Sequence, residues 1–302
     1  RPVGSPFAGG VGGEAGEGTP VTVSAERPVA APDRSLAAPE PLPEAVGAPD
    51  GPEPRIYRLY RRNWGLTDPE TARDYWVANM LQVEVIDRAL GRFVEALKER
   101  GLYDDGAVLF TADHGEMNLE QGLIDKGVYG HPKAGRVPLL LKRPGSADAG
   151  RVVDRDVCLL DVAPMVLDLA GIRPVAQLDG ESLLNRLSES DRGRGTPFLF
   201  EAGWHVAPNP AVALHGEDEE GSRYRYVYNM CSDVDELYRL DDPRYRNRIG
   251  DEEAAGVRVK LRRQLHGIFC GDDRWRCYRQ AFELDNGEDL PGVAGDNQMF
   301  VP

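Results

Sequence analysis

Lysine is scarce in this sequence. Its 302 residues include 5 lysines among 36 basic residues, against 50 acidic residues, which gives a formal net charge of −14. Binding to the phosphates of nucleic acid needs a basic surface, and this balance of charges does not supply one. The composition therefore excludes nucleic acid as an expected partner, and the acidic excess favours solubility.

Cysteine is also sparse, with Cys158, Cys231, Cys270 and Cys277 as its only occurrences. None of them forms a C-x-x-C pair or the spacing of a zinc site, so the cysteines indicate neither a structural zinc site nor a redox motif. Cys270 and Cys277 would be able to bridge in an oxidising compartment, because disulfides follow redox environment. The sequence leaves the compartment open.

Long apolar runs are missing as well. No stretch reaches the 18 or so residues that a membrane span needs, and the first residues lack the basic segment and apolar run of an export signal. We expect no membrane span in these residues. The first residue is Arg rather than Met, from which we expect a processed product or part of a longer chain.

Proline and glycine are concentrated at the start. Residues 1–55 contain 11 Pro and 9 Gly with few large apolar side chains. Such a segment buries too little apolar surface to offset the entropy of ordering its backbone. We predict that residues 1–40 are a linker or disordered segment.

The first regular element is predicted after Thr67-Asp68-Pro69-Glu70. Thr67 and Glu70 have the spacing of a capping box, and proline is favoured at the start of a helix. Apolar residues then recur at steps of three and four, which predicts one buried face against a sheet, and Gly101 ends the helix. The periodic positions are Trp76, Met80, Val83, Ile86, Leu90, Phe93 and Leu97.

Strands and helices alternate in the following segment. Residues 107–111 form a short apolar run that predicts a buried parallel strand, and residues 137–141 form a second strand. A helix is predicted over 159–169, ending at Gly171. This alternation indicates an α/β fold in which residues 41–197 contribute to a layered sheet domain.

The pattern changes from residue 198 onward. Short strand candidates such as 224–228 are separated by turns, and a polar helix is predicted near 252–266. We therefore predict a smaller α+β subdomain over residues 198–302.

The segment with the clearest chemistry is Thr111-Ala112-Asp113-His114-Gly115-Glu116, just past the first strand. Ligands of open α/β sheets bind at the carboxyl ends of strands. Asp113 offers an oxygen donor and His114 a nitrogen donor to one divalent cation, and Gly115 lets the backbone turn beneath them. The simpler alternative is a turn in which Asp113 caps the backbone and His114 is merely exposed.

Several further motifs follow in order, and together they resemble the sulfatase family of the alkaline phosphatase superfamily. The family has Asp-His-Gly or Asp-Asn-Gly, then Gly-Leu with Lys-Gly, Arg-Val-Pro-Leu, Asp-x-x-Pro, Asp-Gly-x-Ser-Leu and Glu-Leu-Tyr. The corresponding residues here are 113–115, 122–123 with 126–127, 136–139, 161–164, 179–183 and 236–238.

The resemblance implies roles for individual residues. It implies that Asp113 and His114 are two of the ligands of a divalent metal, calcium first, with magnesium or manganese as alternatives. It implies that Lys126 is catalytic and faces the oxygens of a sulfate ester, where an ammonium would offset developing charge. His131 stands where the family has another side chain, and it is either a substitute substrate contact or a loop histidine without a role.

The nucleophile of the family is the residue that the resemblance does not supply. Sulfatases use a formylglycine from a Cys-x-Pro-x-Arg or Ser-x-Pro-x-Arg motif upstream of Asp-His-Gly, and neither motif occurs here. We therefore expect a C-terminal portion of a sulfatase-like, metal-dependent sulfuric ester hydrolase, inactive by itself, with an N-terminal half elsewhere, for example separately encoded.

Three interpretations remain open at this point. The first is a hydrolase of small-molecule or glycan sulfate esters. The second is a phosphodiesterase or phosphonate monoester hydrolase of the same superfamily, in which Asp-His pairs also bind metal. The third is a non-catalytic remnant that acts as an interaction protein.

Overall fold

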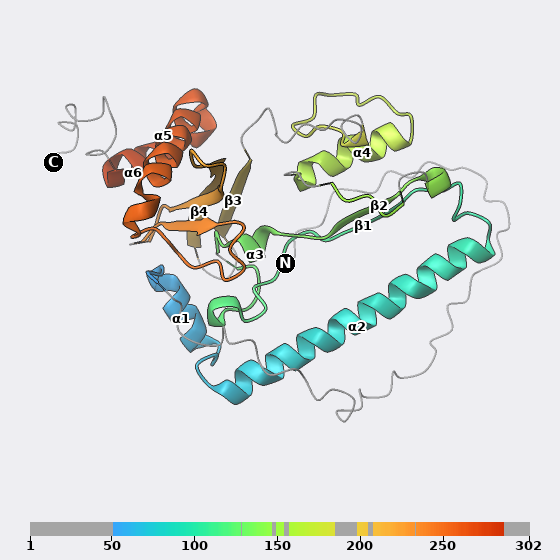
Figure 1. Ribbon diagram of the computed structural model, residues 1–302, viewed down its shortest axis with the longest axis horizontal. Coiled ribbons are helices and arrows are strands. Elements are labelled where there is room, and N and C mark those ends of the chain that lie inside the picture. Colours follow the sequence, from blue (N-terminus) through green and yellow to red (C-terminus); the bar gives the residue numbers. More distant parts are fainter. Residues whose placement is uncertain are drawn as a thin grey trace, which may run out of the picture. The chain divides into compact units, whose positions relative to one another are not determined.

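The computed structural model describes residues 51–127, 129–146, 149–153, 157–184, 198–204, 208–232 and 234–286 (Figure 1). The predicted linker at 1–40 lies outside these residues. Within the described residues the fold is a mixture of helices and two antiparallel sheets. The predicted α/β class is confirmed.

Helix α1 spans Arg55–Asn63 and α2 spans Pro69–Glu99. The cap of α2 is Asp68 rather than Thr67, because an Asp68 carboxylate oxygen accepts the Thr71 backbone N–H at 2.9 Å. The helix terminates before Gly101, whose φ of 66° is the left-handed conformation that glycine adopts easily. The predicted helix is confirmed, with its cap shifted by one residue.

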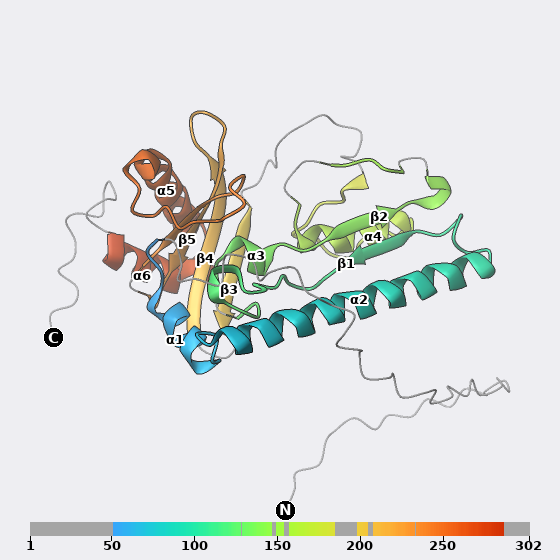
Figure 2. The ribbon, with the colours of Figure 1, turned by 60° about the horizontal axis from the view of Figure 1, so that its bottom comes forward.

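Most of the apolar stripe of α2 is solvent-exposed. Val83, Ile86 and Phe93 are 56%, 53% and 54% exposed, and only near the first turns does the helix reach a core, where Ala72 packs with Leu119. The predicted buried face is therefore wrong beyond the first turns. The sheet that lies alongside α2 has two strands, which is too narrow to cover a 31-residue helix (Figure 2).

Strands β1, Val108–Thr111, and β2, Leu139–Lys142, form this small sheet. They pair antiparallel, with Val108 opposite Lys142 and Thr111 opposite Leu139, and all four residues of β1 are partly exposed. The prediction of a buried parallel strand is wrong. After β1 the chain turns back, and β2 runs alongside β1 in the opposite direction. A parallel pair would need a connection that first crosses back to the starting end of β1.

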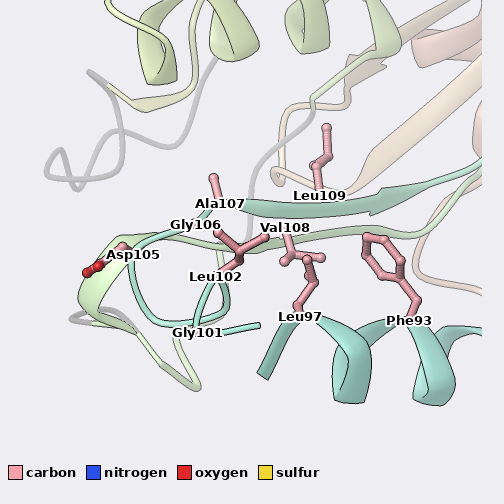
Figure 3. Close-up of a pocket in the computed structure, with 9 residues that line it drawn as sticks. All are labelled: Phe93, Leu97, Gly101, Leu102, Asp105, Gly106, Ala107, Val108 and Leu109. Carbon is pink, nitrogen blue, oxygen red and sulfur yellow. The ribbon is translucent and has the colours of Figure 1, made fainter. Parts of the chain in front are cut away.

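A groove of about 440 Å³ separates the C-terminal end of α2 from β1 (Figure 3). Phe93, Leu97 and Val108 point into the space between the helix and the strand, whereas Leu109 points to the other face of β1. The lining is mainly apolar.

The larger sheet has the order β3-β4-β5-β6, and all its pairs are antiparallel. Its strands span Leu199–Trp204, Pro208–Glu217, Arg223–Asn229 and Glu236–Arg239. Helices α5, Ala255–Gly271, and α6, Arg276–Asn286, cover one face. The strand predicted at 224–228 and the helix predicted near 252–266 are confirmed, and the helix continues to Gly271.

Alternation along β5 explains the two faces of this sheet. Tyr224, Tyr226 and Tyr228 belong to the core beneath α5 and α6, whereas Val227 belongs to the core on the opposite face. Gly130 lies against Val227 on that second face, so the loops after β1 pack directly on the sheet. The predicted boundary between residues 197 and 198 stays a prediction.

Short helices complete the described elements. Two of them are α-helical, α3 at Pro132–Gly135 and α4 at Val162–Leu169, and α4 confirms most of the helix predicted over 159–169. The 3-10 turns are η1 Glu120–Gly122, η2 Pro144–Ser146, η3 Leu159–Asp161, η5 Glu252–Ala254 and η6 Asp273–Trp275. Among the described residues, no helix has both the length and the apolar character that a bilayer crossing requires.

Candidate active-site loop

Asp113 and His114 begin the loop that leaves β1. Their side chains are 86% and 41% exposed, and Asp113 Oδ1 lies 3.5 Å from His114 Nε2. The other ring nitrogen, Nδ1, is 2.8 Å from the Gly115 carbonyl oxygen. A carbonyl can only accept, so Nδ1 donates in this contact, and Nε2 is the ring nitrogen that lies beside the carboxylate.

This pair fits a divalent cation as part of a ligand set. The carboxylate oxygen is the kind of donor that calcium, magnesium and manganese prefer, the imidazole nitrogen is a donor for transition metals, and both side chains are open to solvent. Ligand atoms in octahedral positions at bond lengths of about 2.1–2.4 Å are roughly 3.0–3.4 Å apart, close to the observed separation. Asp113 Oδ1 also accepts the His114 backbone N–H at 3.0 Å, as expected for the simpler turn.

Gly115 is required by close packing rather than by a sharp turn. Its N–H donates to the Ala134 carbonyl at 2.8 Å. A methyl group at this position would come within 2.0 Å of the Lys133 carbonyl oxygen and 2.7 Å of the Arg136 carbonyl oxygen. Because Gly115 has no side chain, α3 packs directly against the backbone that follows Asp113 and His114.

Glu116 organises the rest of the loop. Its Oε1 accepts from the Tyr75 hydroxyl at 3.0 Å, from the Asn118 N–H at 3.2 Å and from the Asp125 N–H at 2.6 Å. The carboxylate and the burial of Tyr75 together raise the pKa of the Tyr75 hydroxyl, with burial the larger cause. One carboxylate thus connects α2 to both ends of the segment 118–125.

Backbone strain is concentrated in the same segment. Four residues other than glycine adopt positive φ, a conformation that costs about 1–3 kcal/mol each and persists where the surroundings impose it. They are Asn118, Leu119, Gln121 and Asp125, with φ of 47°, 65°, 52° and 68°. Such strain is typical of functional loops, and here each side chain is held by a contact.

Lys126 is on this loop, with its ammonium 3.1 Å from Asp125 Oδ1. Asp125 also accepts from the Lys126 backbone N–H at 2.8 Å and from the Tyr60 hydroxyl at 3.4 Å. Burial, followed by the Asp125 charge, raises the pKa of Tyr60 to about 12. Lys126 is thus partly exposed and directed by Asp125, and no described contact joins it to Asp113 or His114.

His131 lies in the core instead of facing the solvent. It is 0% exposed, its ring packs edge-on against Tyr238 and Tyr245 at 4.8 and 5.5 Å, and Nδ1 accepts the Lys133 N–H at 3.1 Å. Burial, with the nearby Arg225 and Lys133 charges, holds the pKa of His131 well below its usual value. The ring is therefore neutral in this setting.

Asp161 joins two of the sequence motifs. Its carboxylate accepts the Cys158 N–H and the Glu181 N–H, both at 3.0 Å, and the residue is 2% exposed. A methyl group at Gly180 would lie 1.9 Å from the Leu160 carbonyl oxygen. The Asp-Gly-x-Ser-Leu turn is therefore fixed against the start of α4.

Sequence reasoning identified Asp113, His114 and Lys126 but missed Glu116, Asp125 and Asp161 as organising residues. The signal for Glu116 was its place directly after Asp-His-Gly. Its partners are up to 41 residues away in the sequence, so the spacing alone gave no indication of the network.

Comparison with solved structures defines the class of fold. A putative sulfatase from Bacteroides thetaiotaomicron VPI-5482 superposes with a TM-score of 0.65 at 21% identity, covering 85% of this chain and 55% of that chain. A phosphonate monoester hydrolase of Agrobacterium radiobacter superposes with a TM-score of 0.51 at 27% identity, covering 62% and 39%. The described fold is part of the alkaline phosphatase-like fold.

Comparison of sequences finds a similarity over part of the chain. Residues 70–172 match the sulfatase family model. Arylsulfatase K of Xenopus laevis is 32% identical over 171 residues, which are 50% of this chain and 31% of the relative. The resemblance to the sulfatase family is confirmed, and the chain spans about a third of the length of this relative.

Proposed function

We propose that this chain provides the metal-binding loop and the C-terminal part of a sulfatase-like hydrolase that cleaves small-molecule or glycan sulfate esters. The observation that carries the proposal is the exposed Asp113–His114 pair, which follows β1 inside the segment matching the sulfatase family model. The Nδ1 contact of His114 leaves its Nε2 on the same side as the carboxylate.

Asp113 and His114 would hold a divalent cation, for which we propose calcium, with magnesium and manganese as alternatives. Such a cation, when bound, polarises the oxygens of the ester and stabilises charge that develops on them. Two donors fall short of the six or more that calcium takes. We therefore propose that further ligands come from outside the described loop, and that this chain binds the ion weakly by itself.

Lys126 is proposed to balance charge on the ester oxygens. Its ammonium is now paired with Asp125, and both lie on the loop that Glu116 fixes to α2. The paired carboxylate orients the lysine side chain until substrate competes for it. Substrate contact by His131 stays a prediction; its complete burial between Tyr238 and Tyr245 favours a packing role.

The exposed apolar stripe of α2 and the groove beside β1 support a partner for this chain. Val83, Ile86 and Phe93 are more than half exposed, a feature typical of an interaction surface. This chain covers 55% of the superposed Bacteroides structure. We propose that the remainder of a sulfatase-like domain, including the nucleophile, packs on this surface, either in the same polypeptide or separately encoded.

The test has two stages. The protein as its gene encodes it is assayed with 4-nitrophenyl sulfate, in wild-type form and with Asp113→Ala, and Asp74→Ala on the exposed side of α2 serves as the matched control. We expect Asp113→Ala to lower kcat/KM by at least about 100-fold, a loss of roughly 2.7 kcal/mol in transition-state stabilisation. Equal turnover by both variants, or no turnover by the wild-type protein when any separately encoded remainder is also supplied, would contradict the proposal.

The second stage measures binding without turnover. Terbium luminescence, excited directly, reports occupancy of a calcium-type site in the 302-residue chain. We expect weaker binding in Asp113→Ala than in Asp74→Ala. Binding without hydrolysis of any ester would favour the non-catalytic, partner-binding interpretation.

A second candidate is hydrolysis of phosphonate monoesters or phosphodiesters. It is favoured by the superposition on the Agrobacterium enzyme, at 27% identity. The same assay with a 4-nitrophenyl phosphonate monoester separates the two, because the ratio of the two kcat/KM values identifies the preferred ester.

A further inference from the structure

A second group of metal-type donors lies on α5 and α6. His266 and Cys270 are four residues apart on α5, so both project from the same face of that helix. Glu283 reaches them from α6. One ligand atom from each of the three lies within 4.8 Å of the others. Among the described residues, these three side chains are the group of three or more His, Cys, Asp or Glu residues placed to hold one metal ion.

The two helices are held in this arrangement by packing. Phe269 contacts Phe282 with ring centroids 5.7 Å apart, and the His266 ring stacks on Phe282 at 6.2 Å. The donors therefore sit at the solvent edge of an aromatic core. Their positions are fixed by that core before any ion arrives, which reduces the entropy lost on binding.

The ligand atoms, all within 4.8 Å of one another, are near the spacing found around one small cation. His266 Nε2 lies 2.9 Å from Glu283 Oε1 and 3.5 Å from Cys270 Sγ. Ligand atoms around tetrahedral zinc, at bond lengths of about 2.0–2.3 Å, are roughly 3.3–3.8 Å apart. A small outward movement of the Glu283 carboxylate would therefore convert its contact with His266 into shared coordination.

We propose that His266, Cys270 and Glu283 form a zinc site that joins α5 to α6. The donor set of imidazole nitrogen, thiolate sulfur and carboxylate oxygen matches zinc and cobalt rather than calcium or magnesium. Three protein ligands leave the fourth position to water. On binding, the thiol of Cys270 releases its proton to solvent and its sulfur becomes a ligand, with no change in oxidation state.

The site is independent of the proposed hydrolase activity. It uses other elements of the fold and another class of metal than the loop of Asp113 and His114. Its expected effect is to stabilise the α5–α6 hairpin that covers the larger sheet, because an ion that binds the folded state alone raises stability by mass action.

The experiment uses the purified 302-residue chain after chelation, with cobalt as a spectroscopic probe for zinc. A thiolate ligand gives cobalt a charge-transfer band in the near ultraviolet. We expect this band at one equivalent in the wild-type chain, and zinc should displace the cobalt. Zinc should also raise the melting temperature by at least about 2 °C.

Variants locate the site. Cys270→Ser should abolish the band and the thermal shift. Glu283→Gln removes a direct ligand and should weaken cobalt binding by at least about tenfold, the loss that even an outer partner of a metal site causes. Cys277→Ser, which removes another exposed cysteine, should leave both unchanged. Absence of the band at one equivalent, or its persistence in Cys270→Ser, would overturn the proposal. Cys270 is exposed, so its substitution leaves the core intact.

Discussion

The hydroxyl of Tyr57 on α1 donates a hydrogen bond of 2.8 Å to the carboxylate of Glu236 on β6, across 179 residues of sequence. Both side chains are completely buried. Asn229 donates to the same carboxylate at 2.9 Å, and the Tyr238 hydroxyl also donates to it. The Glu-Leu-Tyr motif is therefore an anchor that fixes the first described helix to the last strand of the larger sheet.

This anchor predicts a pH dependence of stability. Burial raises the pKa of Glu236 above 4.5, and the hydrogen bonds and Arg225 only partly oppose it. Between pH 4.5 and the folded-state pKa, the folded protein binds more protons than the unfolded chain, so its free energy of unfolding falls as pH rises. Glu236→Gln should remove this part of the slope in urea unfolding measured across that window. Glu70→Gln, on exposed helix surface, should retain it, and equal slopes for Glu236→Gln and the wild type would contradict the assignment.

Gly115 and Gly91 are expected to respond oppositely to alanine. Gly115→Ala forces a methyl group onto two carbonyl oxygens, so we expect the free energy of unfolding to fall by about 1–3 kcal/mol. Gly91 lies inside α2 with nothing within 4 Å of an added methyl group, so Gly91→Ala should raise it by about 0.5–1 kcal/mol. Chemical denaturation measures both, and a neutral Gly115→Ala would show that α3 is free to move.

Asp161→Ala should release the turn at 178–183. Two backbone N–H groups lose their acceptor, which costs about 1–3 kcal/mol for each group left unsatisfied. Hydrogen exchange of the Glu181 amide should accelerate, whereas Asp168→Ala on the exposed side of α4 should leave it unchanged. Unaltered protection of Glu181 in Asp161→Ala would show that the turn is held by other contacts.

Glu116→Ala should loosen the candidate active-site loop without removing any proposed ligand. The Asn118 and Asp125 amides lose their shared acceptor, so their hydrogen exchange should increase. Terbium affinity should fall by about 10-fold or more, the usual effect of losing an outer partner of a metal site. Glu99→Ala, at the far end of α2, is the control. If hydrogen exchange of these two amides is faster but terbium affinity is unchanged, the order of the loop does not control metal binding.

The sequence predicted elements whose signals are local. The apolar period and the glycine stop identified α2, and the short strand candidate between turns identified β5, because both patterns depend on neighbours a few residues away. The pairing of β1 with β2 was predicted wrongly. A short apolar run has the same composition in a parallel and an antiparallel sheet, and the direction depends on the path of the chain between 112 and 138.

In the candidate site too, the sequence identified the residues with local signals and missed those that act through distant partners. Asp113 and His114 were identified because the motif places both donors side by side, but Glu116 acts through Tyr75, and Asp161 acts through Glu181. The burial of His131 depends on Tyr238 and Tyr245, more than 100 residues later. Contacts between distant segments leave no pattern in a single sequence.

The strained segment 118–125 limits how this protein can be engineered. Glycine is the usual remedy for a residue with positive φ, since it relieves the backbone at the expense of some unfolded-state entropy. Here each strained position also has a side-chain contact: Asn118 with Asn79, Leu119 in a core cluster, Gln121 with the Tyr245 carbonyl and Asp125 with Tyr60. A glycine substitution at any of these positions relieves the backbone strain but also removes the side-chain contact. Directed evolution for heat resistance is therefore expected to leave these four positions alone and to find its improvements on the surface of α2.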